Sequence, residues 1–175
     1  MRIETPRLIL RDWTRGDAAS LARAANNPRV AAMMKDSFPN PCTPKDARLF
    51  IYLTRRNPSG IFLAIEFGGE VIGGIAIHRL ADVRRRTAEI GYWLAESYWG
   101  RGIATEAVSA LVPIAFATYD IIRVQAGIFS NNPASMRVLE KCGFHREAVH
   151  SKAFFKNGEL LDEVMYVHFG PVSGN

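Results

Sequence analysis

Residues Tyr98 to Ala107 read YWGRGIATEA, a glycine-rich turn that leads into a run of good helix formers. Glycine destabilises a helix interior, so Gly100 and Gly102 predict a turn, and a helix is expected to begin at about Ile103. The first four N–H groups of a helix have no acceptor within it, and the helix dipole adds partial positive charge there. With the charge of Arg101 beside them, these amides predict a binding site for an anion such as pyrophosphate.

Two well-known phosphate-binding motifs fit this turn poorly. A P-loop requires Lys followed by Ser or Thr after its second glycine, where this chain has Ile103 and Ala104. A dinucleotide fingerprint comes closer, because Asp120 lies eighteen positions past Gly102, but Thr105 replaces the third glycine and βαβ repeats are absent from the pattern. A glycine-rich connector with a solvated arginine is the remaining alternative.

Composition and length place the chain among soluble globular proteins. Hydrophobic residues make up 48% and charged residues 22%, and 175 residues suffice for one domain, expected over residues 1–175 with a core at about 3–169. No apolar run approaches the ~20 residues that cross a bilayer, so no membrane association is expected. The first residues, MRIETPRLIL, lack the apolar segment of a signal peptide, which predicts a cytoplasmic protein.

Charge and histidine spacing exclude some classes of site. The formal net charge of +5 favours anionic partners without identifying one. The basic run Arg84–Arg86 is interpreted as a solvated turn, with a phosphate or acidic contact as the alternative, and no interleaved aromatic residues support direct nucleic-acid binding. The four histidines form no HxH or HxxxH pair, so no metal site is expected; they are His78, His145, His150 and His168.

Helical and strand patterns alternate along the chain and predict an α+β fold on a largely antiparallel sheet. The expected helices are Ala18–Ala25, about Lys45–Arg56, Ile103–Tyr119 and the segment from Asn132 to Lys141. The expected strands are Arg7–Trp13, Ile61–Phe67, Val71–Leu80, Thr87–Ala95, Ile121–Phe129, Phe144–Phe155 and Glu159–Phe169. Pro113 predicts a kink or break in its helix, and Asn157-Gly158 is typical of a hairpin turn.

A second segment, Ser130 to Phe144, begins with a helix start signal. Asn132 followed by Pro133 is typical of an N-cap and first-turn proline, and Ser135 lies one turn into the helix. Taken alone, Asn132 is interpreted as a simple cap and Ser135 as a polar first-turn residue.

Together, the glycine turn and the segment from Asn132 to Phe144 resemble the GNAT superfamily of acetyl-CoA-dependent N-acetyltransferases. Three further stretches resemble its Rim-type branch, which is named for acetylating the N-termini of ribosomal proteins. They are Glu4–Arg11, Ala88–Leu94 running into Tyr98-Trp99, and Asn157–Tyr166. The resemblance extends in order from about residue 3 to residue 169.

The resemblance implies a central mixed, mostly antiparallel sheet of six to seven strands flanked by helices, with splayed strands at the acetyl-CoA site. It implies acetyl transfer from acetyl-CoA, without a metal, to a primary amine of a protein N-terminus or a small molecule. Homodimers are common in this branch. A non-catalytic CoA-binding sensor or scaffold is the alternative, and a nucleic-acid-associated module is a third.

The resemblance also assigns residues to the cosubstrate. The strand that splays from its neighbour would pair with the pantetheine arm, the glycine turn would hold the pyrophosphate through its amides, and a helix-capping Asn would contact the pantetheine or an ordered water. These residues are Tyr92, Trp93, Leu94, Ala95, Gly100, Arg101, Gly102, Ile103, Ala104, Thr105 and Asn132. Trp99 departs from the Gln or Arg that the superfamily often has ahead of this turn, and is interpreted as a packing residue.

A second difference from the superfamily pattern bears on the catalytic residues. The general-acid Tyr common in the superfamily would fall on Leu139, which has no proton to donate, and the branch resemblance then points to Ser135. Direct attack by an amine also needs a base. Glu89 precedes the splayed strand residues and is expected to act as this base through a water. The alternative is that Glu89 is an ordinary surface or ion-paired carboxylate. A backbone N–H at or near Leu94 would hold the oxyanion.

Overall fold

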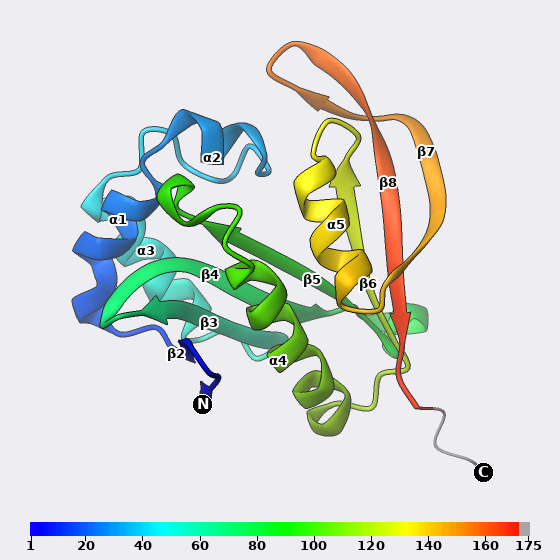
Figure 1. Cartoon of the computed structure of the whole chain (residues 1–175), viewed down its shortest axis with the longest axis horizontal. Coiled ribbons are helices and arrows are strands. Elements are labelled where there is room, and N and C mark those ends of the chain that lie inside the picture. The colour runs from blue at the N-terminus through cyan, green and yellow to red at the C-terminus, as the bar shows by residue number, and fades with distance from the viewer. Residues whose placement is uncertain (172–175) are drawn as a thin grey trace.

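A computed structural model of the protein describes residues 1–171. Within them, eight strands form one sheet in the order β1-β2-β3-β4-β5-β6-β8-β7 (Figure 1). Neighbouring strands are antiparallel except β5 and β6, which are parallel. The strands are β1 (Arg2–Glu4), β2 (Leu8–Asp12), β3 (Gly60–Phe67), β4 (Glu70–Arg79), β5 (Thr87–Leu94), β6 (Arg123–Phe129), β7 (His145–Lys156) and β8 (Glu159–Phe169).

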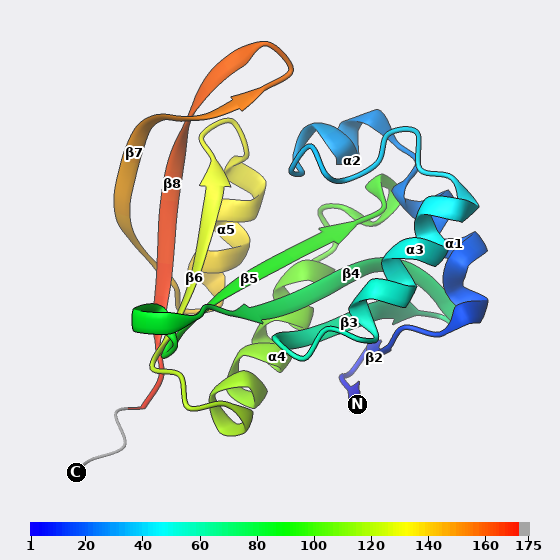
Figure 2. The same ribbon diagram turned by 180° about the vertical axis from the view of Figure 1, so that it is seen from behind.

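The α-helices cover both faces of this sheet, as Figures 1 and 2 show from opposite sides. They are α1 (Ala18–Ala25), α2 (Pro28–Ala32), α3 (Pro44–Thr54), α4 (Ile103–Thr118) and α5 (Pro133–Lys141). Helices α4 and α5 bury their apolar residues in a large core on one face, while α1 and α3 enclose a smaller core on the other. Among the helices of the described part of the chain, none combines the length and apolar character that crossing a membrane requires.

The sheet has one strand more than the upper limit of six to seven that the resemblance implied. The additional strand β1 was not predicted from the sequence, and it pairs with β2 through partners such as Ile3 and Leu10. Pro6, which has no N–H for a ladder, lies between the two strands, and β2 begins at Leu8 rather than at the predicted Arg7. A strand of three residues is too short to give a visible alternation in the sequence.

Pro113 does not break α4, although its position in the sequence predicted a kink or break. The helix continues without a break from Ile103 to Thr118, with Pro113 inside it and exposed to solvent. Leu111, Val112 and Ala115 on the opposite side are buried against the sheet. This apolar face holds the helix together across the missing hydrogen bond of the proline.

Side-chain caps fix the starts of two helices, and the cap at Asn132 was predicted. The side chain of Thr43 accepts a hydrogen bond from the backbone N–H of Asp46 at the start of α3. Asn132 does the same for Ser135 at the start of α5, and each helix has proline at its first position. The hairpin predicted at Asn157-Gly158 is confirmed, with Lys156 paired to Glu159.

Candidate active site

Strands β5 and β6 separate from each other in the middle of the sheet. They pair only from Thr87 to Glu89 on β5 and from Arg123 to Gln125 on β6. Beyond these residues β5 stays with β4 and β6 stays with β8, so the two strands form a fork that is visible in Figures 1 and 2. Past the fork, one edge of each strand has no neighbouring strand, which leaves backbone groups available to a ligand.

Alternating side chains of β5 point to opposite faces of the sheet. Ile90 and Tyr92 face the large core with α4 and α5. Glu89 and Trp93 therefore face the other side, where Trp93 packs edge-to-face on Phe38 with ring centroids 5.4 Å apart. The side chain of Trp93 thus lies on the opposite face from that of Tyr92. Only the backbone of Trp93 is accessible from the Tyr92 face.

The glycine turn lies where the sequence predicted it, directly before the helix that begins at Ile103. Gly100 and Gly102 have φ values of 73° and 74°, in the left-handed region where side chains other than glycine are strained. Among residues 1–171, the backbone amides from Gly100 to Thr105 donate to no backbone acceptor, and the first helical bond comes from Glu106 to the Gly102 carbonyl. This set of free amides at a helix N-terminus fits a pyrophosphate.

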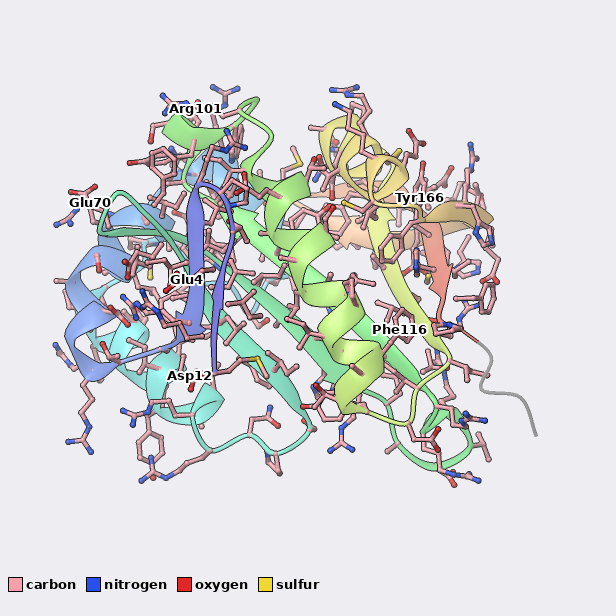
Figure 3. All side chains as sticks on the ribbon, turned by 60° about the horizontal axis from the view of Figure 1, so that its bottom comes forward. Glu4, Asp12, Glu70, Arg101, Phe116 and Tyr166 are labelled. Atoms are coloured by element: carbon pink, nitrogen blue, oxygen red, sulfur yellow. The ribbon has the colours of Figure 1, made fainter. Side chains whose placement is uncertain are left out.

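Side chains in the turn contribute in different ways. Arg101 is exposed, and its guanidinium lies 5.3 Å from the ring centroid of Tyr98. Figure 3 shows Arg101 ahead of the first turn of α4, at the opposite end of the helix from Phe116. Ile103 is buried in the core, so its contribution to an anion site is its backbone amide.

The N-terminal segment braces this turn through a contact that was not predicted from the sequence. Glu106 accepts hydrogen bonds from the Thr5 hydroxyl at 2.6 Å and from Arg7 Nε at 2.7 Å. Arg7 Nη1 also donates to the Arg101 carbonyl at 3.0 Å. Burial alone would raise the pKa of Glu106, but these hydrogen bonds outweigh burial and lower it. Glu106 is thus ionised beside a predicted anion site, with its charge balanced by Arg7.

Replacing Arg7 with alanine is therefore expected to weaken acetyl-CoA binding by roughly tenfold, because one charge-assisted hydrogen bond is worth ~1.5–3 kcal/mol. The change releases the Arg101 carbonyl and leaves the carboxylate of Glu106, beside the predicted pyrophosphate site, without the charge of Arg7. Calorimetric titration with acetyl-CoA measures the effect. Arg2→Ala is the matched control, since Arg2 pairs with Glu4 on the surface. Equal affinity in the two variants would show that the brace has no role in binding.

Residues from β5 and α5 meet across the fork. The Tyr92 hydroxyl lies 2.8 Å from Ser135 Oγ and 3.2 Å from the Ser135 carbonyl. Burial raises the pKa of Tyr92, against the opposing hydrogen bond from Ser135, so its phenol stays protonated at neutral pH. Asn132 Oδ1 accepts from the Ser135 amide at 3.1 Å. Leu139, the position of the superfamily tyrosine, is fully buried in the core.

The other predicted catalytic residue, Glu89, lies at the base of the fork. Its Oε1 accepts a hydrogen bond from Gln125 Nε2 at 3.2 Å, and Gln125 Oε1 accepts from Arg123 Nε at 3.1 Å. Gln125 is only 3% exposed, and these two hydrogen bonds orient its amide. Glu89 and Ser135 are thus on opposite faces of the fork, and the structure does not bring them into contact. Gln125 was not predicted, because its role depends on strand register.

The face that bears Glu89 also has a pocket near the fork. The pocket has a volume of about 350 Å³, and Phe38, which packs on Trp93, is one of its walls. The pocket lies between the α2 region and the β7–β8 turn. An ion pair between Lys156 and Asp36, at 2.7 Å, joins these two segments. Within residues 1–171, no group of three or more His, Cys, Asp or Glu is placed to hold a metal ion.

The fork and the free amides beside it are the features that the resemblance to acetyl-CoA-dependent acyltransferases implied. Residues 7–145 match the family described as "Acetyltransferase (GNAT) domain". The chain belongs to this family, and it is an acetyl-CoA-dependent N-acetyltransferase.

Similar proteins support this assignment. The chain is 34% identical over 170 residues to the uncharacterized N-acetyltransferase YoaA of Bacillus subtilis, covering 94% of each chain. It is 35% identical over 97 residues, 55% of this chain and 54% of the other, to the ribosomal-protein-serine acetyltransferase of Escherichia coli. The structure of the Microcin C7 self immunity acetyltransferase MccE, in complex with acetyl-CoA and AMP, has a TM-score of 0.82 and 25% identity over 95% of this chain and 94% of that one.

Proposed function

We propose that this chain, as one domain, transfers the acetyl group of acetyl-CoA to a primary amine by direct attack within the fork of β5 and β6. The observation that supports this most is the placement of Glu89 and Ser135 on opposite faces of the fork. An amine that enters from the Glu89 face meets a base, and a thiolate that leaves on the α5 face meets a hydroxyl. The amine belongs to a protein N-terminus or to a small molecule.

Acetyl-CoA supplies the thioester, and the amides of Gly100 to Thr105 are the groups that would hold its pyrophosphate. The two glycines allow the left-handed turn, and the Arg7–Glu106 brace holds it in position, so the amides are preorganised. Binding therefore requires little rearrangement of the loop. The free edge of β5 from Tyr92 to Ala95 is left for the pantetheine amides.

Proton transfer is divided between the two faces. Glu89, oriented by Gln125, takes the proton that the attacking amine loses, through a water. Ser135 donates a proton to the thiolate that leaves, and Tyr92 holds the Ser135 side chain by the 2.8 Å hydrogen bond. A backbone N–H at or near Leu94 stabilises the oxyanion. One proton leaves the nitrogen and one is added to the sulfur, and the cycle closes when Glu89 releases its proton to solvent and Ser135 takes one back from solvent.

The proposal is tested by incubating the protein with labelled acetyl-CoA and a panel of small amines and peptides with free or blocked N-termini. We expect thiol release together with acetylated product for unblocked amines only. Glu89→Gln and Ser135→Ala should each slow product formation. Binding of acetyl-CoA without acetylation of any amine, and with both variants behaving like the wild type, would instead support a CoA-binding sensor.

A further inference from the structure

Glu163 on β8 points over the fork from the side of β6. β6 and β8 pair with Phe129 opposite Glu163, and they lie side by side in Figures 1 and 2. Glu163 reaches back over Gly127, where a Cβ would lie 2.0 Å from Glu163 Oε1. Because Ala126 faces the large core, Gly127 and the carboxylate above it lie on the opposite face, the face of Glu89.

A histidine holds this carboxylate in place. His150 on β7 is directly opposite Glu163, and its Nδ1 donates to Glu163 Oε2 at 2.7 Å. The adjoining backbone is also fixed, because Asp162 Oδ1 accepts from the Lys152 amide at 2.8 Å. The side chain of Glu163 is 20% exposed, and among residues 1–171 its Oε1 has no hydrogen-bond partner. One oxygen of an oriented carboxylate is therefore free to receive a donor.

The position of this oxygen relative to Glu89 defines what it can contact. Gln125, the partner of Glu89, precedes Gly127 by two residues on β6, which is ~7 Å along a strand. Phe129 and Phe154 pack edge-to-face beside it, with ring centroids 4.9 Å apart, and form an apolar wall. This spacing and the apolar wall favour a short aliphatic chain with a nitrogen at each end.

We propose that Glu163, positioned by His150, is a specificity residue that binds a second cationic group of the amine acceptor. The favoured acceptors are then aliphatic diamines whose reacting nitrogen lies near Glu89 and whose other ammonium reaches Glu163 Oε1. This inference rests on the proposed function for the assignment of the acceptor face. Gly127 serves the same contact, because a side chain there would occupy the place of the carboxylate.

The test is calorimetric titration of two amines of equal chain length, cadaverine and n-pentylamine, into the protein saturated with CoA. CoA lacks the acetyl group, so binding is measured without reaction. The wild type is expected to bind cadaverine roughly tenfold more tightly than pentylamine, as one charge-assisted contact predicts. Glu163→Gln is expected to remove this preference and leave pentylamine affinity unchanged.

Two further variants separate the contact from general effects. Gly127→Ala displaces the flexible end of Glu163 and should also remove the preference, with unchanged thermal stability. Glu70→Gln removes the same charge at the start of β4, labelled in Figure 3, and should retain the preference for cadaverine. Absence of a preference in the wild type, or its survival in Glu163→Gln, would overturn the inference.

The test of the Glu163 contact and the test of the proposed function can fail separately. Selective cadaverine binding that depends on Glu163, without acetylated product from acetyl-CoA, would support the contact and contradict the catalytic proposal. Acetylation of both amines with equal efficiency in the wild type and in Glu163→Gln would support catalysis and contradict the contact.

Discussion

Replacing Gly102 with valine is expected to weaken acetyl-CoA binding by at least about a hundredfold and to leave the fold intact. Gly102 has a φ of 74°, which costs an L-residue ~1–2 kcal/mol and a β-branched one more. The turn therefore moves away from this conformation, and the amides from Gly100 to Thr105 no longer converge. Loss of two charge-assisted hydrogen bonds, at ~1.5–3 kcal/mol each, accounts for the hundredfold change.

Calorimetry with acetyl-CoA measures this effect, and Gly68→Val provides its matched control. Gly68 has a φ of 59° in the β3–β4 turn, so valine there causes a similar backbone strain away from the fork. The control should bind acetyl-CoA as the wild type does and lose only some thermal stability. If Gly102→Val bound acetyl-CoA as tightly as the control, the pyrophosphate would have to lie elsewhere.

The second large effect is expected at Glu89. Glu89→Gln keeps the size of the side chain but removes its ability to take a proton, and loss of a general base costs ~10²–10⁴ in rate. We expect kcat to fall by about a hundredfold or more, with unchanged affinity for acetyl-CoA. Steady-state kinetics on an acetylated amine, combined with calorimetry, separate the two quantities.

Gln125→Ala and Ser135→Ala provide smaller expected effects with which the fall in kcat of Glu89→Gln can be compared. Gln125→Ala leaves the carboxylate in place and removes only its orienting hydrogen bond, so a smaller fall in kcat is expected. Ser135→Ala removes a weak acid, and a thiolate leaves even without full protonation, so its effect should also be smaller. A Glu89→Gln variant with wild-type kcat would assign the base to another group or to solvent.

Local features of this protein were predictable from sequence. Glycine favours a turn over a helix interior, so Gly100 and Gly102 were sufficient to predict a turn that leads into a helix at Ile103. An N-cap acts within three residues, so Asn132 also identified the start of its helix. The prediction of the fork between β5 and β6 had a different basis. It came from the resemblance to a family and not from strand patterns.

Contacts between distant segments were not predictable in this way. Arg7 and Glu106 are 99 positions apart, and nothing in either neighbourhood indicates the other. Gln125 and Glu163 reach the fork only through the register of β6 with its two neighbours. A shift of one residue would turn each to the opposite face, and a sequence pattern does not define register at that accuracy.

A crystal structure of the protein with acetyl-CoA tests the central claim most directly. We expect the pyrophosphate oxygens to accept hydrogen bonds from amides between Gly100 and Thr105. We also expect the pantetheine arm along the free edge of β5 and the thioester in the fork, between Glu89 and Ser135. Pyrophosphate bound away from the glycine turn, or a thioester outside the gap between β5 and β6, would contradict the account.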